Sequence, residues 1–295
     1  VDYAYVDCAL ASDEAQLAEH ILNASASRQP LEKIAADVKR FLKEVEMTLE
    51  VDPVKIRVRK VGREGLREVM DYASRKTVVF DEFQEVLRIS KALPGKMRSI
   101  IQHKRNSFVF LGSKRHAMEE LFGSPNSPFY NSGVVLNLEK IPAKEFAPFI
   151  SFWFKKTRAG LEENDVEEVL AFSEGHPYYT QYACHFLWDR RKQGDRTAVK
   201  DVIKAIVEMN SDFYERLFSG LTTNQKKALS IVATEDNVFS GKALERFGIG
   251  SAQNLQKALG SLANKEVIDK NGAYYFTDLF FRQWVLYQTV LNQKV

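Results

Sequence analysis

The sequence predicts an α/β protein that starts with a parallel sheet and continues into a helical domain and a winged helix-turn-helix. Short apolar segments alternate with amphipathic segments over the first 140 residues. This order is typical of a parallel sheet with crossover helices. Residues 141–217 show helical periodicity alone, and the remainder ends in three helices and a hairpin. We therefore expect three domains, over residues 1–140, 141–217 and 218–295.

The composition is ordinary for a globular protein, with 45% hydrophobic and 27% charged residues. A formal net charge of +3 is too small to indicate a polyanionic partner by itself. Cys8 and Cys184 make neither a disulfide framework nor a zinc site, and they fit a reducing cytoplasm. No apolar run approaches the ~18 residues that span a bilayer, so we expect a cytoplasmic protein without a membrane partner.

The central feature of the first part is the segment TVVFDEF at residues 77–83. It is apolar without alternation until two acids end it, which predicts a strand buried on both faces of a sheet. Because a buried charge is costly, we expect Asp81 and Glu82 at the carboxyl edge, where open α/β sheets bind ligands. Apolar residues followed by Asp-Glu form the Walker B pattern of P-loop ATPases. The alternative is a strand that ends in a solvated acidic turn.

The rest of the first part supplies the neighbours of this strand. Further strands are predicted over residues 3–8, 54–61, 107–111 and 134–138. In residues 54–61 apolar and basic residues alternate, as on an exposed or edge strand. Helices are predicted from a cap at Ser12 and over residues 31–45, 66–73, 85–93 and 114–122. We expect the helix over residues 85–93 to end at Pro94-Gly95.

The second part is predicted to be helical until its final hairpin. Thr222 and Gln225 are spaced as in a capping box, and a hairpin is expected to turn at Asn271-Gly272. Helices are predicted over residues 143–158, 164–173, 177–192, 198–217, 241–247 and 252–264. Two aromatic groups have the spacing of core residues, with a partner-binding face as the alternative. They are Phe149, Phe152, Trp153 and Phe154 in one helix, and Phe276, Phe280, Phe281 and Trp284 near the end.

Four motifs give the chain a family resemblance. They are TVVFDEFQEV at residues 77–86, FVFLGS at 108–113, SPFY at 127–130 and GHPYYTQ at 175–181. Together with the winged helix, they resemble the archaeal-type AAA-like P-loop ATPases, close to the STAND class of signalling NTPases and its MNS group. The resemblance covers nearly the whole chain. It implies a P-loop NTPase-like sheet, a helical lid, ATP and Mg²⁺ as cofactors, and nucleotide as a partner.

The resemblance also implies roles for particular residues. Asp81 would serve Mg²⁺, Glu82 would activate water, and Ser113 would sense the γ-phosphate. A turn at Gly175, His176 and Pro177 would open a lid helix whose amino end approaches the nucleotide, as helix N-termini favour anions. Proline suits the first helical turn. The alternatives are a capping or packed His176 and an ordinary strand-to-helix cap at Ser113.

The sequence departs from the family in its phosphate-binding loop. The pattern G-x-x-x-x-G-K-[ST] does not occur, and Gly95-Lys96 and Gly241-Lys242 lack the rest of it. In the family this loop precedes the strand expected at residues 3–8, so the N-terminal unit of the sheet core is missing. Nothing else would cradle the β- and γ-phosphates, so we expect weak ATP binding and negligible hydrolysis. We expect truncation of a normal ATPase, with a naturally degenerate scaffold as the alternative.

Several basic residues are candidates for contacts with phosphate or nucleic acid. Arg115 could contact a γ-phosphate, although a solvated charge is favoured. The cluster of Lys55, Arg57, Arg59 and Lys60 could bind nucleic acid. We favour the alternative that these charges lie on a solvated edge strand and prevent it from pairing with other sheets. Residues 218–292 hold eight Lys/Arg and six Asp/Glu, and the presumed recognition helix has one cation, Lys257. We therefore favour a protein partner for the winged helix over DNA.

The function expected from these features is a nucleotide-dependent switch that moves the lid and the winged helix. The alternative is a non-enzymatic DNA- or protein-binding winged helix on a degenerate ATPase scaffold.

Overall fold

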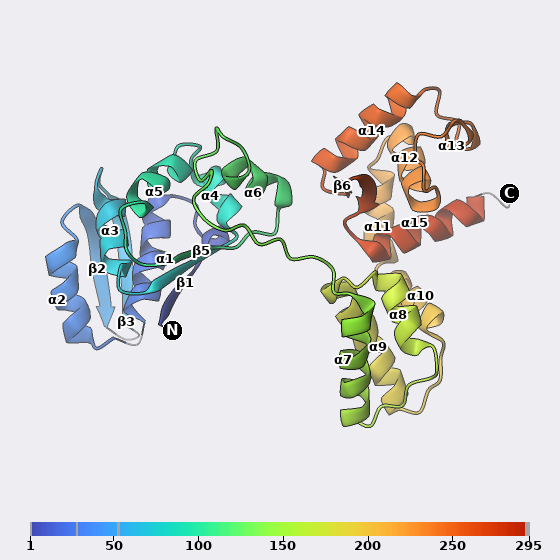
Figure 1. Ribbon diagram of the computed structural model, residues 1–295, viewed down its shortest axis with the longest axis horizontal. Helices are drawn as coiled ribbons and strands as arrows, with labels where there is room; N and C mark the ends of the chain where they lie inside the picture. The colour runs from blue at the N-terminus through green and yellow to red at the C-terminus, as the bar shows by residue number, and fades with distance from the viewer. Residues whose placement is uncertain (1, 28, 52–53, 293–295) are drawn as a thin grey trace. The chain divides into compact units, whose positions relative to one another are not determined.

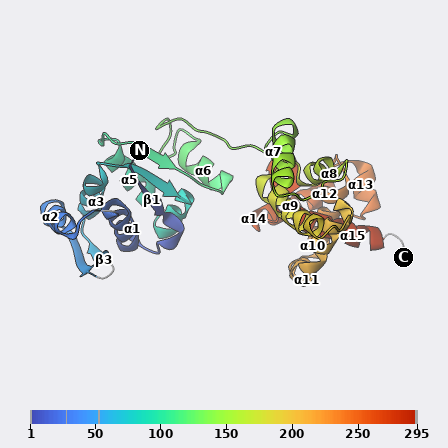
Figure 2. The ribbon, with the colours of Figure 1, turned by 90° about the horizontal axis from the view of Figure 1, so that it is seen from below.

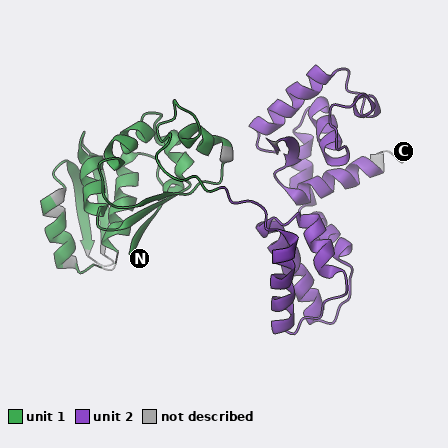
Figure 3. Cartoon of the chain, in the orientation of Figure 1, with its two compact units in different colours: residues 1–136 green, residues 137–295 purple. Residues whose placement is uncertain are grey.

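The computed structural model describes residues 2–27, 29–51 and 54–292 (Figure 1). They form two compact units, residues 1–136 and 137–295, each with its own hydrophobic core (Figure 3). The first unit holds the α/β part of the chain, and the second holds the helices and the winged helix. The finer division into domains over residues 1–140, 141–217 and 218–295 stays a prediction.

A three-stranded parallel sheet organises the first unit. Its strands are β1 (Tyr3–Asp7), β4 (Thr77–Asp81) and β5 (Phe108–Phe110), in the order β1-β4-β5. Asp7 lies opposite Asp81 in the register of β1 and β4. This arrangement confirms the predicted α/β class with a parallel core, and it makes the acid-tipped strand the middle one.

The sheet is buried on one face, and the prediction of burial on both faces is wrong. Ala4, Val6, Val78 and Phe80 are buried in the core of the unit. The core also takes in side chains from α1 (Glu14–Ala26), α3 (Gly65–Ala73) and α5 (Leu93–Ile101), and α1 packs directly against β1 (Figures 1 and 2). Residues on the opposite face, including Tyr3, Tyr5 and Val109, are exposed.

A separate two-stranded antiparallel sheet joins β2 (Val45–Val51) to β3 (Val54–Val61). The strand predicted over residues 54–61 is therefore confirmed, but the helix predicted over residues 31–45 is too long. Helix α2 (Leu31–Phe41) ends early, and Val45 already belongs to β2. Arg57 pairs with Glu19 at 3.2 Å and with Glu50 at 3.3 Å, so part of the basic cluster is neutralised in place.

Several local predictions in the first unit are also wrong. Asp13, not Ser12, caps α1, since its side chain accepts the Gln16 N–H at 2.8 Å. The helix expected over residues 85–93 is replaced by a 3₁₀ turn η2 (Phe83–Glu85) and the short α4 (Val86–Ile89). Pro94 does not end a helix but lies in the first turn of α5, where its missing N–H costs nothing. Helix α6 (Arg115–Phe122) follows β5 as expected.

Residues 134–138 do not form the predicted strand. Val134 is 89% exposed and Leu138 is 99% exposed, and the segment pairs with no strand in the described chain. Strand-forming residues make a strand only when a neighbouring strand accepts their hydrogen bonds. The sequence shows the propensity but not whether that neighbour is present.

The second unit is helical and ends in a winged helix, as predicted. Its first helices, α7 to α10, pack on one another in sequence order (Figure 2). The helix expected over residues 198–217 is broken at Asn210 into two. The helices are α7 (Ala143–Lys156), α8 (Asp165–Ser173), α9 (Pro177–Lys192), α10 (Val199–Met209) and α11 (Ser211–Ser219).

The winged helix consists of three helices, a hairpin and a closing helix. The predicted capping box of Thr222 and Gln225 is confirmed. Phe276, Phe280, Phe281 and Trp284 are buried, as expected for core residues. The elements are α12 (Thr223–Thr234), α13 (Gly241–Arg246), α14 (Ala252–Asn264), β6 (Ile268–Asn271), β7 (Ala273–Phe276) and α15 (Leu279–Asn292).

The aromatic residues of α7 depart from the prediction. Phe154 is buried, but Phe149, Phe152 and Trp153 are 57%, 55% and 43% exposed. Helical spacing places the three rings on one side of α7, whereas the buried stripe consists of Phe146, Ile150 and Phe154. The expectation that all four aromatics belong to the core is therefore wrong for three of them.

A tight turn between α8 and α9 ties the parts of the second unit together. Gly175 has a φ of +74°, and its carbonyl accepts the Ile141 N–H at 2.9 Å. The neighbouring Glu174 carboxylate bonds Arg282 of α15 at 3.0 Å and also pairs with Lys140. Tyr179, in the first turns of α9, donates its hydroxyl to the Thr277 carbonyl at 2.7 Å.

The geometry of this turn indicates how a methyl group at Gly175 would change the stability of the second unit. A Cβ there would lie 2.2 Å from the Ile141 carbonyl oxygen, in a backbone region that L-residues avoid. We expect Gly175→Ala to lower the free energy of unfolding of this unit by about 3 kcal/mol. Gly194 has a similar φ of +77° in open space, so Gly194→Ala should cost only about 1 kcal/mol from strain.

The measurement is urea unfolding followed by tryptophan fluorescence, because all three tryptophans lie in the second unit. Equal losses in the two alanine variants would show that the contact with Ile141 contributes nothing beyond the backbone strain.

Candidate nucleotide site

Two carboxylates end the middle strand of the parallel sheet. Phe80 is fully buried, and the next residue, Asp81, lies at the carboxyl edge beside Asp7 of β1. One Asp81 oxygen accepts the Glu82 backbone N–H at 2.9 Å, and the other accepts the hydroxyl of Tyr5. The acids therefore lie at the edge where α/β sheets bind ligands. Their roles toward a metal ion and a water molecule stay predictions.

Glu82 is held by two side-chain donors. Its Oε2 accepts the Ser113 hydroxyl at 2.8 Å and the amide of Gln84. Its backbone lies in the left-handed region, with φ 48° and ψ 44°. A non-glycine residue in that region is strained, and such strain gathers at functional sites. The structure thus brings Glu82 and Ser113 together, two residues that the sequence places 31 positions apart.

A cluster of phenylalanines packs around the end of β4 and holds the carboxyl edge of the sheet in place. The Phe83 ring centroid lies 4.6 Å from that of Phe110 and 5.4 Å from that of Phe129. Phe110 also stacks on Phe80 at 5.8 Å. These contacts join β4, β5 and the SPFY loop into one packed layer. The phenylalanines of these motifs therefore support the strand end that carries the carboxylates.

The chain passes close to two side chains where β5 leaves the sheet, at Gly112. A Cβ on Gly112 would lie 2.6 Å from the side-chain oxygen of Gln84 and 2.4 Å from the sulfur of Met118. The close approach lets Ser113, the next residue, reach Glu82. The Gly-Ser pair in FVFLGS thus has a steric reason in this structure.

Sequence reasoning missed two residues of this site, Tyr5 and Gln84. Tyr5 lies two residues before Asp7, on the face of β1 that is exposed, and its 49% exposure fits that position. Gln84 is only 4% exposed, and its side-chain oxygen has no partner among the described residues. The one available signal for Gln84 is an amide inside the otherwise apolar or acidic stretch FDEFQEV. The side chain of Arg115, the candidate arginine, is outside the described part of the structure.

The lid-turn residues lie in the second unit. His176 caps α9 through Nδ1, which accepts the Tyr178 N–H at 3.2 Å, and Pro177 begins the helix. Partial burial, followed by the charge of Lys140, lowers the pKa of His176. The imidazole is therefore neutral at pH 7, as an accepting Nδ1 requires. Asp81 and Glu82 belong to the first unit, so the approach of Gly175, His176 and Pro177 to a nucleotide stays a prediction.

The residues at the edge fit one side of an ATP–Mg²⁺ site. No three His, Cys, Asp or Glu side chains gather into a metal cluster within the described residues. Mg²⁺ does not need such a cluster, because it keeps several waters and binds one or two carboxylates plus phosphate oxygens. Asp81 supplies a carboxylate of that kind. The phosphate-binding loop is absent from the 295 residues.

Asp81 also sets the ionisation of Tyr5. The hydrogen bond to Asp81 is the largest of several effects that raise the pKa of Tyr5 to about 12. Because the protonated hydroxyl makes the bond, the bond should persist up to about that pH and be lost above it. We expect Asp81→Asn to bring the pKa of Tyr5 down toward the ordinary value of about 10.

An NMR titration can follow the ring signal of Tyr5, identified by its loss in Tyr5→Phe. Asp71→Asn is the control, since Asp71 pairs with Lys104 and not with Tyr5. An unchanged Tyr5 titration in Asp81→Asn would contradict the contact.

None of the described helices has the length and apolar character that a membrane crossing requires. A model described as a probable winged helix domain matches residues 212–287. No curated protein matches the sequence.

Comparison with solved structures extends over most of the chain. The structure is similar to the Walker-type ATPase paby2304 of Pyrococcus abyssi, with a TM-score of 0.62 and 17% identity over 96% of this chain and 84% of that one. Weaker matches are the ORC2 protein of Aeropyrum pernix in its ADP form and a RuvB variant of Thermotoga maritima. ORC2 gives a TM-score of 0.43 and 13% identity, covering 99% of this chain and 78% of that one. RuvB gives 0.39 and 16%, covering 96% and 87%.

With TM-scores below 0.5, the two weaker matches do not establish a shared fold. The first establishes that this chain has the fold of a Walker-type ATPase, combined with a C-terminal winged helix.

Proposed function

We propose that this protein is a nucleotide-dependent switch in which ATP–Mg²⁺ binds at the carboxyl edge of β4. The observation that carries the proposal is the pair of carboxylates there, with Glu82 held by Ser113 and Gln84 beside Asp81. The fold of a Walker-type ATPase supports it. Domain movement on nucleotide binding is a common response of such proteins.

Each residue has a proposed task. Asp81 binds the metal ion, directly or through water, and Ser113 senses the γ-phosphate. Glu82 orients the attacking water and accepts its proton, a contribution that is typically worth 10²–10⁴-fold in rate. Two donors on one oxygen of Glu82 keep the carboxylate oriented and leave its other oxygen for that water. In the second unit, the amino end of α9 at Gly175, His176 and Pro177 contacts the nucleotide.

We further propose that a phosphate-binding strand, loop and helix complete the site. Within the described residues β5 pairs only with β4, so its second edge is open to a further strand. The exposed sheet face and the unpaired residues 134–136 support the same proposal, because apolar surface of this kind is normally covered. The 295 residues would then be unable to hydrolyse ATP by themselves.

The free thiols fit a cytoplasmic location for this switch. Cys8 and Cys184 form no disulfide, and burial raises the pKa of each thiol to about 12. Cys8 is buried and Cys184 half-buried, and thiols with so high a pKa are unreactive.

An ATPase assay tests the proposal. We expect the 295-residue chain to hydrolyse ATP no faster than a blank. A version preceded by a strand–GxxxxGK[ST]–helix segment should hydrolyse ATP, and Glu82→Gln should lower that rate at least about 100-fold. Glu85→Gln is the matched control, because Glu85 pairs with Arg88 and Lys114 and should leave the rate within about twofold.

Hydrolysis by the 295-residue chain that is lost in Glu82→Gln would contradict the need for a phosphate loop. In the protein supplied with a phosphate-binding loop, Asp81→Asn should weaken the binding of ATP–Mg²⁺. Equal affinity with and without Asp81→Asn would contradict the proposed metal site.

The winged helix favours a second candidate function, a binding module that works without nucleotide. Gln253, Asn254, Gln256 and Lys257 are exposed along α14. Amides can read bases, but one cation supplies little phosphate attraction. We therefore propose a protein partner for this surface.

Titration with duplex DNA separates the alternatives for α14. We expect weak binding that changes less than about twofold in Lys257→Ala, because a single phosphate contact contributes little. Tight binding that falls steeply with salt and with Lys257→Ala would instead assign the helix to DNA.

A further inference from the structure

The exposed rings of α7 form a surface in the second unit to which the proposed nucleotide switch assigns no role. We propose that this surface binds single-stranded nucleic acid. Phe149, Phe152, Trp153 and Lys156 are spaced i, i+3, i+4 and i+7, so they share one side of the helix. We call this set the α7 stripe. Its three rings are each about half exposed, which is unusual for three neighbouring aromatic residues of a globular protein.

The helix that carries the stripe, with the turn after it, has an excess of positive charge, although acids follow in residues 161–168. Residues 143–160 hold Lys144, Lys155, Lys156 and Arg158 against the one carboxylate of Glu145. All of these side chains are exposed, and the cations form no ion pair with another described residue. The ion pairs of the structure lie elsewhere, so these charges are available to a partner. The complement of the stripe is therefore an anion that also carries apolar faces.

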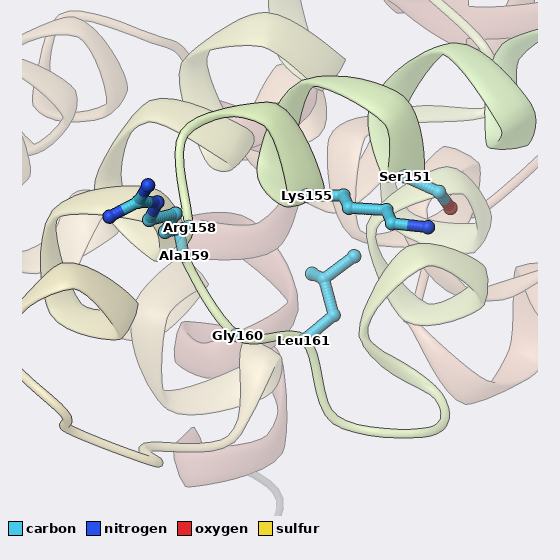
Figure 4. A pocket seen from close by; sticks show the side chains of 6 residues that line it. All are labelled: Ser151, Lys155, Arg158, Ala159, Gly160 and Leu161. Atoms are coloured by element: carbon cyan, nitrogen blue, oxygen red, sulfur yellow. The ribbon is translucent and has the colours of Figure 1, made fainter.

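One cation of α7 lies directly against the rings of the stripe. The Lys156 ammonium is 4.4 Å from the Trp153 ring centroid and 5.6 Å from that of Phe152. Near the end of α7, a shallow hollow of about 400 Å³ is lined in part by Ser151, Lys155 and Leu161. In the view of Figure 4, the side chains of Ser151 and Lys155 come from the same helix, and the Arg158 guanidinium points away from them. The hollow thus holds one cation and one hydroxyl from α7.

Nucleic acid fits this surface better than a folded protein does. The stripe runs about 10 Å along the helix, which matches about three stacked nucleotides at roughly 3.4 Å each. The exposed apolar residues of the stripe are all aromatic. Trp153 packs edge-to-face on Phe149 and Phe152, and bases of any sequence stack on the faces of such rings that stay exposed. A duplex hides its bases, so a single strand is the form that the stripe selects.

The test measures binding of a short labelled oligothymidylate to the full chain by fluorescence anisotropy. Oligouridylate distinguishes DNA from RNA, and duplex DNA and poly-L-glutamate serve as competing classes. Trp153 is exposed, whereas Trp188 is half-buried and Trp284 is buried, so base stacking should quench the Trp153 emission.

We expect both single strands to bind, with affinity falling as salt rises. Trp153→Ala should weaken binding about tenfold, while Trp153→Phe should keep the affinity within about threefold and lose the quenching. Lys155→Glu combined with Lys156→Glu should make the log–log salt slope shallower by about one unit. Phe213→Ala and Lys200→Glu alter an exposed ring and an exposed cation elsewhere in the same unit, and they should change nothing.

Three results would overturn the proposal. One is no detectable binding of either single strand at low salt. Another is equal weakening by Phe213→Ala and Trp153→Ala. The third is binding of poly-L-glutamate as tight as that of the oligonucleotides, which would assign the stripe to an acidic polypeptide. Thermal unfolding of each variant separates loss of binding from loss of fold.

Discussion

The structure of the first unit depends on the cost of burying charge. Phe80 is fully buried in the middle strand, and the next two residues are carboxylic acids, so the strand must end where the sheet meets solvent. The phenylalanines of β4, β5 and the SPFY loop hold that end in place. With the strand fixed, Glu82 accepts a strained backbone conformation and the donors Ser113 and Gln84 converge on it. The site is thus a consequence of the core beneath it.

In the second unit, the turn between α8 and α9 likewise depends on the residues packed against it. The GHPYY motif combines a glycine that a neighbouring carbonyl requires, a neutral histidine that caps α9, and Tyr179. Tyr179 bonds the loop between β7 and α15 and packs its ring 5.5 Å from that of Phe280. The turn therefore contacts both the segment entering the unit, through Ile141, and the winged helix. Under the proposed function, it is the element through which lid and winged helix move together.

The sequence predicted features that local rules determine. The acid-tipped strand, the capping box at Thr222 and the hairpin at Asn271-Gly272 follow from residue type and spacing alone. It could not predict which face of the sheet is covered, because Tyr5 and Val79 look as apolar as Val78. For the same reason the exposed rings of α7 and the unpaired residues 134–138 were assigned to a core and a strand. Tyr5 and Gln84 enter the site through contacts between distant segments, which no local pattern encodes.

The claim at the centre of this account is that the end of β4 receives a metal-bound nucleotide. The most direct measurement is paramagnetic broadening of amide NMR signals by Mn²⁺–ATP, in the protein supplied with a phosphate-binding loop. The account predicts broadening centred on Asp81, Glu82 and Ser113, and its disappearance in Asp81→Asn. Broadening centred elsewhere, or unchanged in Asp81→Asn, would contradict it.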